Sequence, residues 1–249
     1  MASTEKSAEP LAVAKVSLGL LVAIGLARTV ALSVGNGISL WGFVLAGSTR
    51  PLTLTLAGTK IWIVAVDILT IYLVVKLLAR EGASLTPLLS PQPVGRNLLR
   101  ALGGVVIVYF AFYFGGFAGN LLVYYGGAPI ADAVRLPVWL GVVRLVAVPI
   151  TVAVAEEVLF RGYLLPRLQV HMGRVGAVIV TSLLAGAQYV AFAMGNWDAV
   201  LAGFIGYFIV NLAFGALYLW FKHLMPLILI HWFFEAVAGY AILLVALQH

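Results

Sequence analysis

The sequence predicts an all-α fold, a polytopic membrane protein with about seven transmembrane helices. Of the 249 residues, 63% are hydrophobic and only 10% are charged, and the mean hydropathy is +1.09. A water-soluble domain of this length carries roughly 25% charged residues. Lipid allows a chain to cross it only as helices or as a closed barrel. The apolar runs here are long and continuous rather than alternating, so helices are the expected structure.

A helix needs about 20 apolar residues to cross the hydrocarbon core of a bilayer. The spans predicted on this basis are 11–34, 61–79, 101–125, 138–159, 174–195, 199–220 and 225–247. The segment 38–58 is too interrupted for a span and is expected to be re-entrant or interfacial. Because no repeat or low-complexity tract divides the chain, residues 1–249 are expected to form a single membrane domain.

Lysine and arginine residues are shared unequally between the predicted loops, and this bias indicates orientation. With the N-terminus inside, the cytoplasmic loops hold Lys6, Arg80, Arg96, Arg100, Arg167, Arg174 and Lys222, and the outer loops hold Arg50, Lys60 and Arg135. A cytoplasmic N-terminus is therefore predicted. The net charge of +6 is scattered over loops, so it indicates topology in a lipid membrane and argues against a nucleic-acid partner.

Ionisable side chains inside a span cost about 2.5–3.5 kcal/mol each on insertion scales, so each one needs a reason. Arg28, Asp67 and Arg144 lie in predicted spans and have no partner at helical spacing. We interpret them as structural charges. Asp67 and Arg144 are expected to neutralise each other or to bind backbone groups inside the bundle.

The stretch VAVAEEVLFRGYLLPR, residues 152–167, places two adjacent carboxylates in an apolar run. Glu157 and Arg161 are four residues apart, so they share a helix face and are expected to form an ion pair. Glu156 is rotated by about 100° from Glu157 and meets a different neighbour. A desolvated carboxylate without such a partner is a plausible general base. A helix end at the cytoplasmic interface would instead leave both glutamates solvated, and the spacing leaves both interpretations open.

The last span contains ILIHWFFEAV, in which His231 and Glu235 are also four residues apart. A lone histidine on an apolar face is more often a packing residue than a ligand, but a carboxylate at helical spacing makes this one a candidate site residue. Imidazole and carboxylate suit zinc or manganese, so a divalent metal on Glu156, His231 and Glu235 is an alternative. The chain has no cysteine, which excludes thiolate sites and disulfides, and no cofactor is the first expectation.

The segment AEEVLFRGYLLPRL resembles the first motif of the CAAX prenyl protease and bacteriocin-processing (abortive-infection) family of intramembrane glutamate proteases. The motif falls on Glu156, Glu157, Arg161 and Gly162. GRVGAVIVTSLLAGAQYV is similar to the second helix of that family, and FIVNLAFGALYLWFKHLMPLILIHWFFE to its closing segment. The resemblance implies variable N-terminal helices over 1–137 and a catalytic core, the C-terminal four helices, over 138–247.

The resemblance also implies roles for the motif residues. Glu156 would activate a water as general base, Glu157 and Arg161 would support it, and His231 would stabilise the oxyanion. Two positions depart from the family pattern: its second histidine falls on Tyr189, and its last asparagine falls on Glu235. A tyrosine is a poor base at pH 7, and a carboxylate donates a hydrogen bond only when protonated.

Three functions remain open at this level. The first is an intramembrane CAAX-type endopeptidase, a hydrolase that cleaves a peptide near the cytoplasmic face of a bacterial or archaeal inner membrane. The second is a pseudoenzyme that binds a peptide or a membrane-protein partner as a subunit of a complex. The third is a small transporter, for which inverted repeats or discontinuous helices would be expected.

Overall fold

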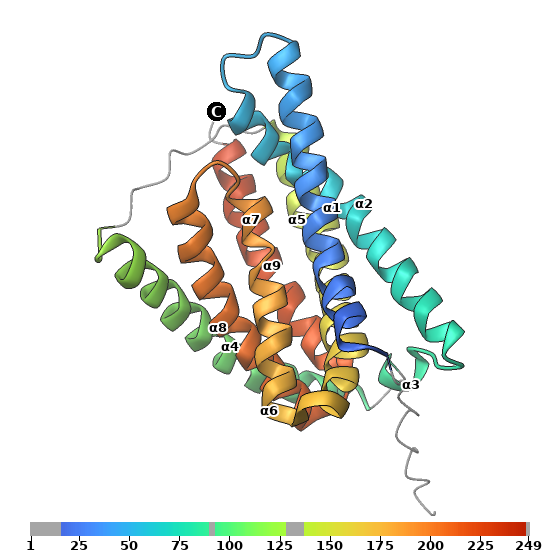
Figure 1. Ribbon diagram of the computed structural model, residues 1–249. Helices are drawn as coiled ribbons and strands as arrows, with labels where there is room; N and C mark the ends of the chain where they lie inside the picture. The colour runs from blue at the N-terminus through green and yellow to red at the C-terminus, as the bar shows by residue number, and fades with distance from the viewer. Residues whose placement is uncertain (1–15, 90–92, 128–136, 248–249) are drawn as a thin grey trace, which may run out of the picture.

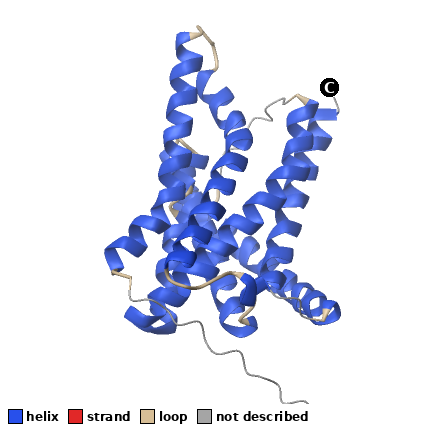
Figure 2. Ribbon diagram, turned by 90° about the vertical axis from the view of Figure 1, so that its right-hand side faces the viewer, coloured by secondary structure: helices blue, strands red, loops and turns tan. Residues whose placement is uncertain are grey.

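The computed structural model describes residues 16–89, 93–127 and 137–247, and all regular structure in these residues is helical (Figure 2). The helices are α1 (Leu18–Leu45), α2 (Pro51–Arg80), α3 (Thr86–Leu89), α4 (Val94–Tyr124), α5 (Val138–Glu156), the π-helix η1 (Glu157–Leu164), α6 (Leu165–Gly186), α7 (Tyr189–Phe192), α8 (Trp197–Phe221) and α9 (Leu224–Leu247). Six helical stretches in the described residues are long and apolar enough to cross a membrane. The chain is therefore an integral, multi-pass membrane protein, as predicted.

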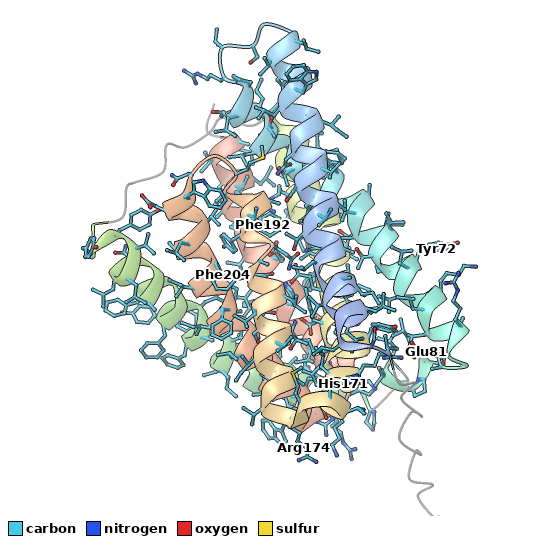
Figure 3. The ribbon with its side chains drawn as sticks, viewed as in Figure 1. Tyr72, Glu81, His171, Arg174, Phe192 and Phe204 are labelled. Carbon is cyan, nitrogen blue, oxygen red and sulfur yellow. The ribbon has the colours of Figure 1, made fainter. Side chains whose placement is uncertain are left out.

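One of these stretches, Val138–Phe192, is 55 residues long and contains two of the predicted spans, 138–159 and 174–195. No loop separates the two, because α5 continues through η1 into α6. The chain turns at Gly173, whose φ of 72° lies in the left-handed region that suits glycine. Figure 3 shows His171 and Arg174, on either side of this turn, at the lower end of the molecule.

Segment 38–58 forms the end of α1, a turn and the start of α2, so the re-entrant alternative was wrong, whereas the interfacial alternative stays a prediction. Helix α1 continues to Leu45 and α2 begins at Pro51, a favourable residue for the first turn. Asn36 lies inside α1, just past the predicted end of the first span, and its side chain binds two other helices. Its Nδ2 donates to the Ala191 carbonyl (2.8 Å), and its Oδ1 accepts from the Thr59 hydroxyl (2.6 Å). Residues 11–15, the predicted start of the first span, lie outside the described residues.

The helices pack around a core made of α5, η1, α6, α8 and α9. Helices α1 and α2 cover one side of this core and α4 covers the opposite side (Figure 1). Small residues bring the helices close: an added Cβ at Gly119 of α4 would lie 2.5 Å from the carbonyl oxygen of Ala202 on α8. Gly239 of α9 approaches the backbone of Arg144 on α5 in the same way. Such close backbone approach is typical of helix packing in membranes.

A polar contact at the lower end of the molecule joins the end of α2 to the start of α6. The carboxylate of Glu81, just after α2, forms an ion pair with Arg167 and accepts a hydrogen bond from the Tyr163 hydroxyl at 2.9 Å. The Arg167 guanidinium carbon lies 3.8 Å from the centre of the Tyr163 ring. We call these three residues the lower clamp. Figure 3 labels Glu81 at this end of the molecule.

Substitution of Gly119 by alanine is expected to weaken the contact between α4 and α8. The new methyl group would meet the Ala202 carbonyl oxygen, and overpacking of this kind costs about 1–3 kcal/mol. Gly116 of the same helix has no atom within 4 Å of an added Cβ, so Gly116→Ala is the matched control and should gain up to about 1 kcal/mol from helix propensity. Thermal unfolding in detergent measures both, and equal unfolding temperatures for the two variants would contradict this packing.

Candidate functional site

Glu156 and Glu157 lie about midway between Val138 and the turn at Gly173, and neither side chain is exposed. The chain stays helical through both residues, so the alternative of a solvated helix end at the interface is wrong. Residues Glu157–Leu164 form a π-helix, and all eight are buried. Widened helical turns of this type are rare and are frequently found at functional sites.

Each carboxylate oxygen of Glu156 accepts a hydrogen bond. Arg28 of α1 donates from Nη1 to Oε1 at 2.8 Å, and Tyr207 of α8 donates from its hydroxyl to Oε2 at 2.8 Å. Helices α1, α5 and α8 therefore meet at this one side chain. The carboxylate is held in place from two sides.

Arg28 binds a second carboxylate, that of Asp67 on α2. Its Nε and Nη2 donate to Asp67 Oδ1 at 3.0 and 2.6 Å. The predicted neutralisation of Asp67 by Arg144 was therefore wrong, because Arg144 lies near Glu235 instead, at 4.0 Å. The true partners are 39 residues apart in sequence, so no helical spacing could reveal them.

Glu157 forms the predicted ion pair with Arg161, at 3.2 Å between Oε1 and Nη1. His231 Nδ1 lies 3.0 Å from the same oxygen, and because a carboxylate only accepts, Nδ1 carries the proton. Arg161 in turn donates from Nη2 to Asn211 Oδ1 at 2.7 Å. Among the described residues, Glu157 Oε2 has no hydrogen-bond partner.

His231 and Glu235 share a helix face but have different partners. His231 faces Glu157, with its ring centre 5.2 Å from that of Phe214. Glu235 faces Arg144, and a quarter of its side chain is exposed. In the described part of the chain, no three histidine, cysteine, aspartate or glutamate side chains are grouped so as to hold a metal ion. The described residues therefore offer no set of ligands for the metal considered on Glu156, His231 and Glu235.

Tyr189 begins the short helix α7, and its ring packs toward the site. The ring centre lies 5.6 Å from that of Tyr207 and 5.8 Å from that of Phe192. An added Cβ at Gly203 of α8 would overlap the Tyr189 ring, so the ring fits there only because Gly203 has no side chain. Tyr189 thus reaches Glu156 through Tyr207, the residue that donates to the carboxylate.

A cavity of about 270 Å³ lies between α1 and α2. Apolar side chains of both helices line it together with Leu159 of η1, and Arg28 is the charged residue in the lining. The residue that binds Glu156, Arg28, is thus part of the cavity wall. It has the composition of a site for an apolar group.

Four further residues of the site were not identified as such from the sequence. Arg28 and Asp67 were interpreted as structural charges, and Tyr207 and Asn211 were not singled out. The sequence does contain a signal for Tyr207 and Asn211, because they are two polar residues four apart in an apolar helix. In the structure, Asn211 Nδ2 donates to the Tyr207 carbonyl at 2.8 Å. The pairing of α1 with α2 carries no comparable signal.

Comparison with protein families identifies the segment that holds most of this site. Residues 137–237 match the family model described as "Type II CAAX prenyl endopeptidase Rce1-like", which confirms the resemblance found in the motifs. The matched segment includes Glu156, Glu157, Tyr207 and His231, whereas Arg28 and Asp67 precede it. No curated protein and no solved structure matches the chain.

Loss of Arg161 is expected to destabilise the protein strongly. Arg161→Leu removes the arginine partner of the buried Glu157, and breaking a buried pair on one side costs about 3–5 kcal/mol. Arg174→Leu removes an exposed arginine of α6 and should stay within about 0.5 kcal/mol of the parent protein. Thermal unfolding of both variants in the same detergent tests this, and a similar loss for both would show that the buried pair has no special weight.

Proposed function

Because residues 137–237 carry the type II CAAX prenyl endopeptidase Rce1-like domain, we propose that this chain is an intramembrane endopeptidase that uses a glutamate to activate water. The observation that carries the proposal is the convergence of Glu156, Glu157 and His231 inside the bundle. Helices α5, η1 and α9 supply them, and none is more than 7% exposed. A dry, preorganised polar site stabilises developing charge far better than water does.

In the proposed reaction, Glu156 takes a proton from a water molecule while the water oxygen bonds to the carbonyl carbon of the substrate. The resulting oxyanion collapses, the carbon–nitrogen bond breaks, and the proton passes from Glu156 to the leaving amine. Tyr207 occupies Glu156 Oε2 in the structure, so the incoming water takes its place. The displaced hydroxyl is then free to donate a hydrogen bond to the oxyanion.

His231 is the second donor to the oxyanion in this proposal. Its Nδ1–H is held by Glu157, which leaves Nε2 to face the substrate. Charge balance supports an imidazolium here: Arg28, Arg161 and a doubly protonated His231 match Asp67, Glu156 and Glu157 in number. Buried charges are stable only when they are paired in this way.

We further propose that the substrate is a peptide with a prenylated cysteine near its C-terminus, as the family description implies. The apolar cavity between α1 and α2 supports this, because it offers a volume of about 270 Å³ for an apolar chain beside Arg28. Cleavage after the modified cysteine would release the last three residues of a CaaX sequence.

A second function is supported by the hydrogen bonds that Glu156 already accepts within the protein. Both of its oxygens are bound, Tyr189 stands in place of a histidine, and Glu235 lies near Arg144. A chain that kept this closed arrangement would act as a pseudoprotease, binding a peptide or a membrane protein without cleaving it. Isolation of a stable membrane complex that survives Glu156→Gln, together with no cleavage, would favour this function.

Glu156→Gln is expected to abolish proteolysis. Loss of a general base lowers the rate by about 10²–10⁴, and glutamine keeps the size of the side chain. The measurement is the release of the C-terminal tripeptide from a farnesylated CaaX peptide by purified protein in lipid nanodiscs, followed by mass spectrometry. The matched control is Glu81→Gln in the lower clamp, which should keep its rate. Unchanged cleavage by Glu156→Gln would refute the assignment of the base.

A further inference from the structure

The Arg28–Asp67 couple lies on α1 and α2, before the matched segment 137–237, yet it contacts the proposed base directly. Arg28 is 2% exposed and Asp67 is fully buried. Three guanidinium nitrogens are used: Nε and Nη2 for Asp67, and Nη1 for Glu156. The two N-terminal helices thus supply a partner for a residue of the matched segment.

We propose that Arg28 is a positioning residue for Glu156, and that Asp67 sets the orientation of Arg28. This inference rests on the proposed function. It makes the α1–α2 hairpin a working part of the site, so the matched segment is incomplete without it.

The first argument is the geometry of the guanidinium group. It is a planar fork whose five N–H groups point in fixed directions. Because Asp67 Oδ1 holds both Nε and Nη2, at 3.0 and 2.6 Å, rotation about the end of the Arg28 side chain is blocked. Nη1 must then point in one direction, and Glu156 Oε1 lies there at 2.8 Å. A lysine is a point charge and gives no such orientation.

The second argument is the cost of Asp67. Glu156 alone would neutralise Arg28, so a second carboxylate adds a buried charge that carries an insertion penalty. Among the described residues, Asp67 Oδ2 has no hydrogen-bond partner, which adds to that cost. Compensation of the charge of Arg28 alone therefore does not explain why Asp67 binds this guanidinium group. Orientation of Arg28 does explain it, because Asp67 holds Nε and Nη2 of Arg28 and leaves Nη1 for Glu156.

The lower clamp shows what a purely structural pair of this type looks like. Arg167 also binds a carboxylate of the α2 end through Nε and Nη2, and both side chains are nearly buried. Its Nη1, however, donates to the carbonyl of Tyr163 at 2.8 Å, a helix backbone group. Nη1 of Arg28 thus binds the proposed base, whereas Nη1 of Arg167 binds a backbone carbonyl. The lower clamp is therefore the matched control.

The test measures kcat and KM for Asp67→Asn on the farnesylated peptide. We expect kcat to fall by about 10²-fold, because a displacement of roughly 1 Å in a catalytic group has an effect of this size. KM should be unchanged, since Asp67 is separated from the substrate by Arg28. Asp67→Glu should recover part of the loss, and Arg28→Lys should recover none relative to Arg28→Gln. Glu81→Gln should keep its kcat within about twofold, because the hydrogen bonds of Glu81 go to Tyr163 and Arg167 and not to Glu156.

An unchanged kcat for Asp67→Asn would overturn the proposal, as would an equal fall for Glu81→Gln.

A second test needs no activity. It is a double-mutant cycle in which the unfolding temperatures of Arg28→Gln, Glu156→Gln and the double variant are compared. We expect the double variant to unfold at a higher temperature than Arg28→Gln alone, because it no longer buries an unpaired Glu156. Additive effects would overturn the role of Arg28. Absence of cleavage by the parent protein, with a coupled cycle, would refute the proposed function and leave Arg28 as the residue that holds Glu156.

Discussion

A carboxylate buried among membrane helices has to find its counter-charge inside the protein, and this constraint organises the bundle. Glu156 draws on Arg28 of α1 and Tyr207 of α8, while Glu157 draws on Arg161 and on His231 of α9. Two adjacent residues thereby connect four helices. Because an unpaired charge costs several kcal/mol in this environment, the contacts leave few alternative packings.

Backbone geometry makes these contacts possible. The π-helix that begins at Glu157 widens the turn just where two neighbouring carboxylates need different partners. Glycines then let the surrounding helices approach closely, as at Gly239 against α5 and Gly203 against Tyr189. Small residues thus bring the polar groups of separate helices within hydrogen-bond distance.

Local patterns in the sequence predicted a part of the site. The ion pair of Glu157 and Arg161 follows from helical spacing, and the membrane class follows from composition. The same spacing rule places His231 and Glu235 on one helix face, but it could not show that they bind different neighbours. It also could not find the partner of Asp67, because a pairing between two helices depends on their register, and hydrophobic residues specify that register weakly in lipid.

The sequence by itself determined that this protein is a helical membrane protein, and that residues around Glu156 carry the family motif. It also determined the pairing of Glu157 with Arg161, which depends on one helix alone. Only the tertiary structure decided that Arg28 and Asp67 complete the surroundings of Glu156 and that α1 runs on to Leu45. The physical reason is that composition and helical period act within a segment, whereas the counter-charge of a buried group is chosen between segments, by whichever helices pack side by side.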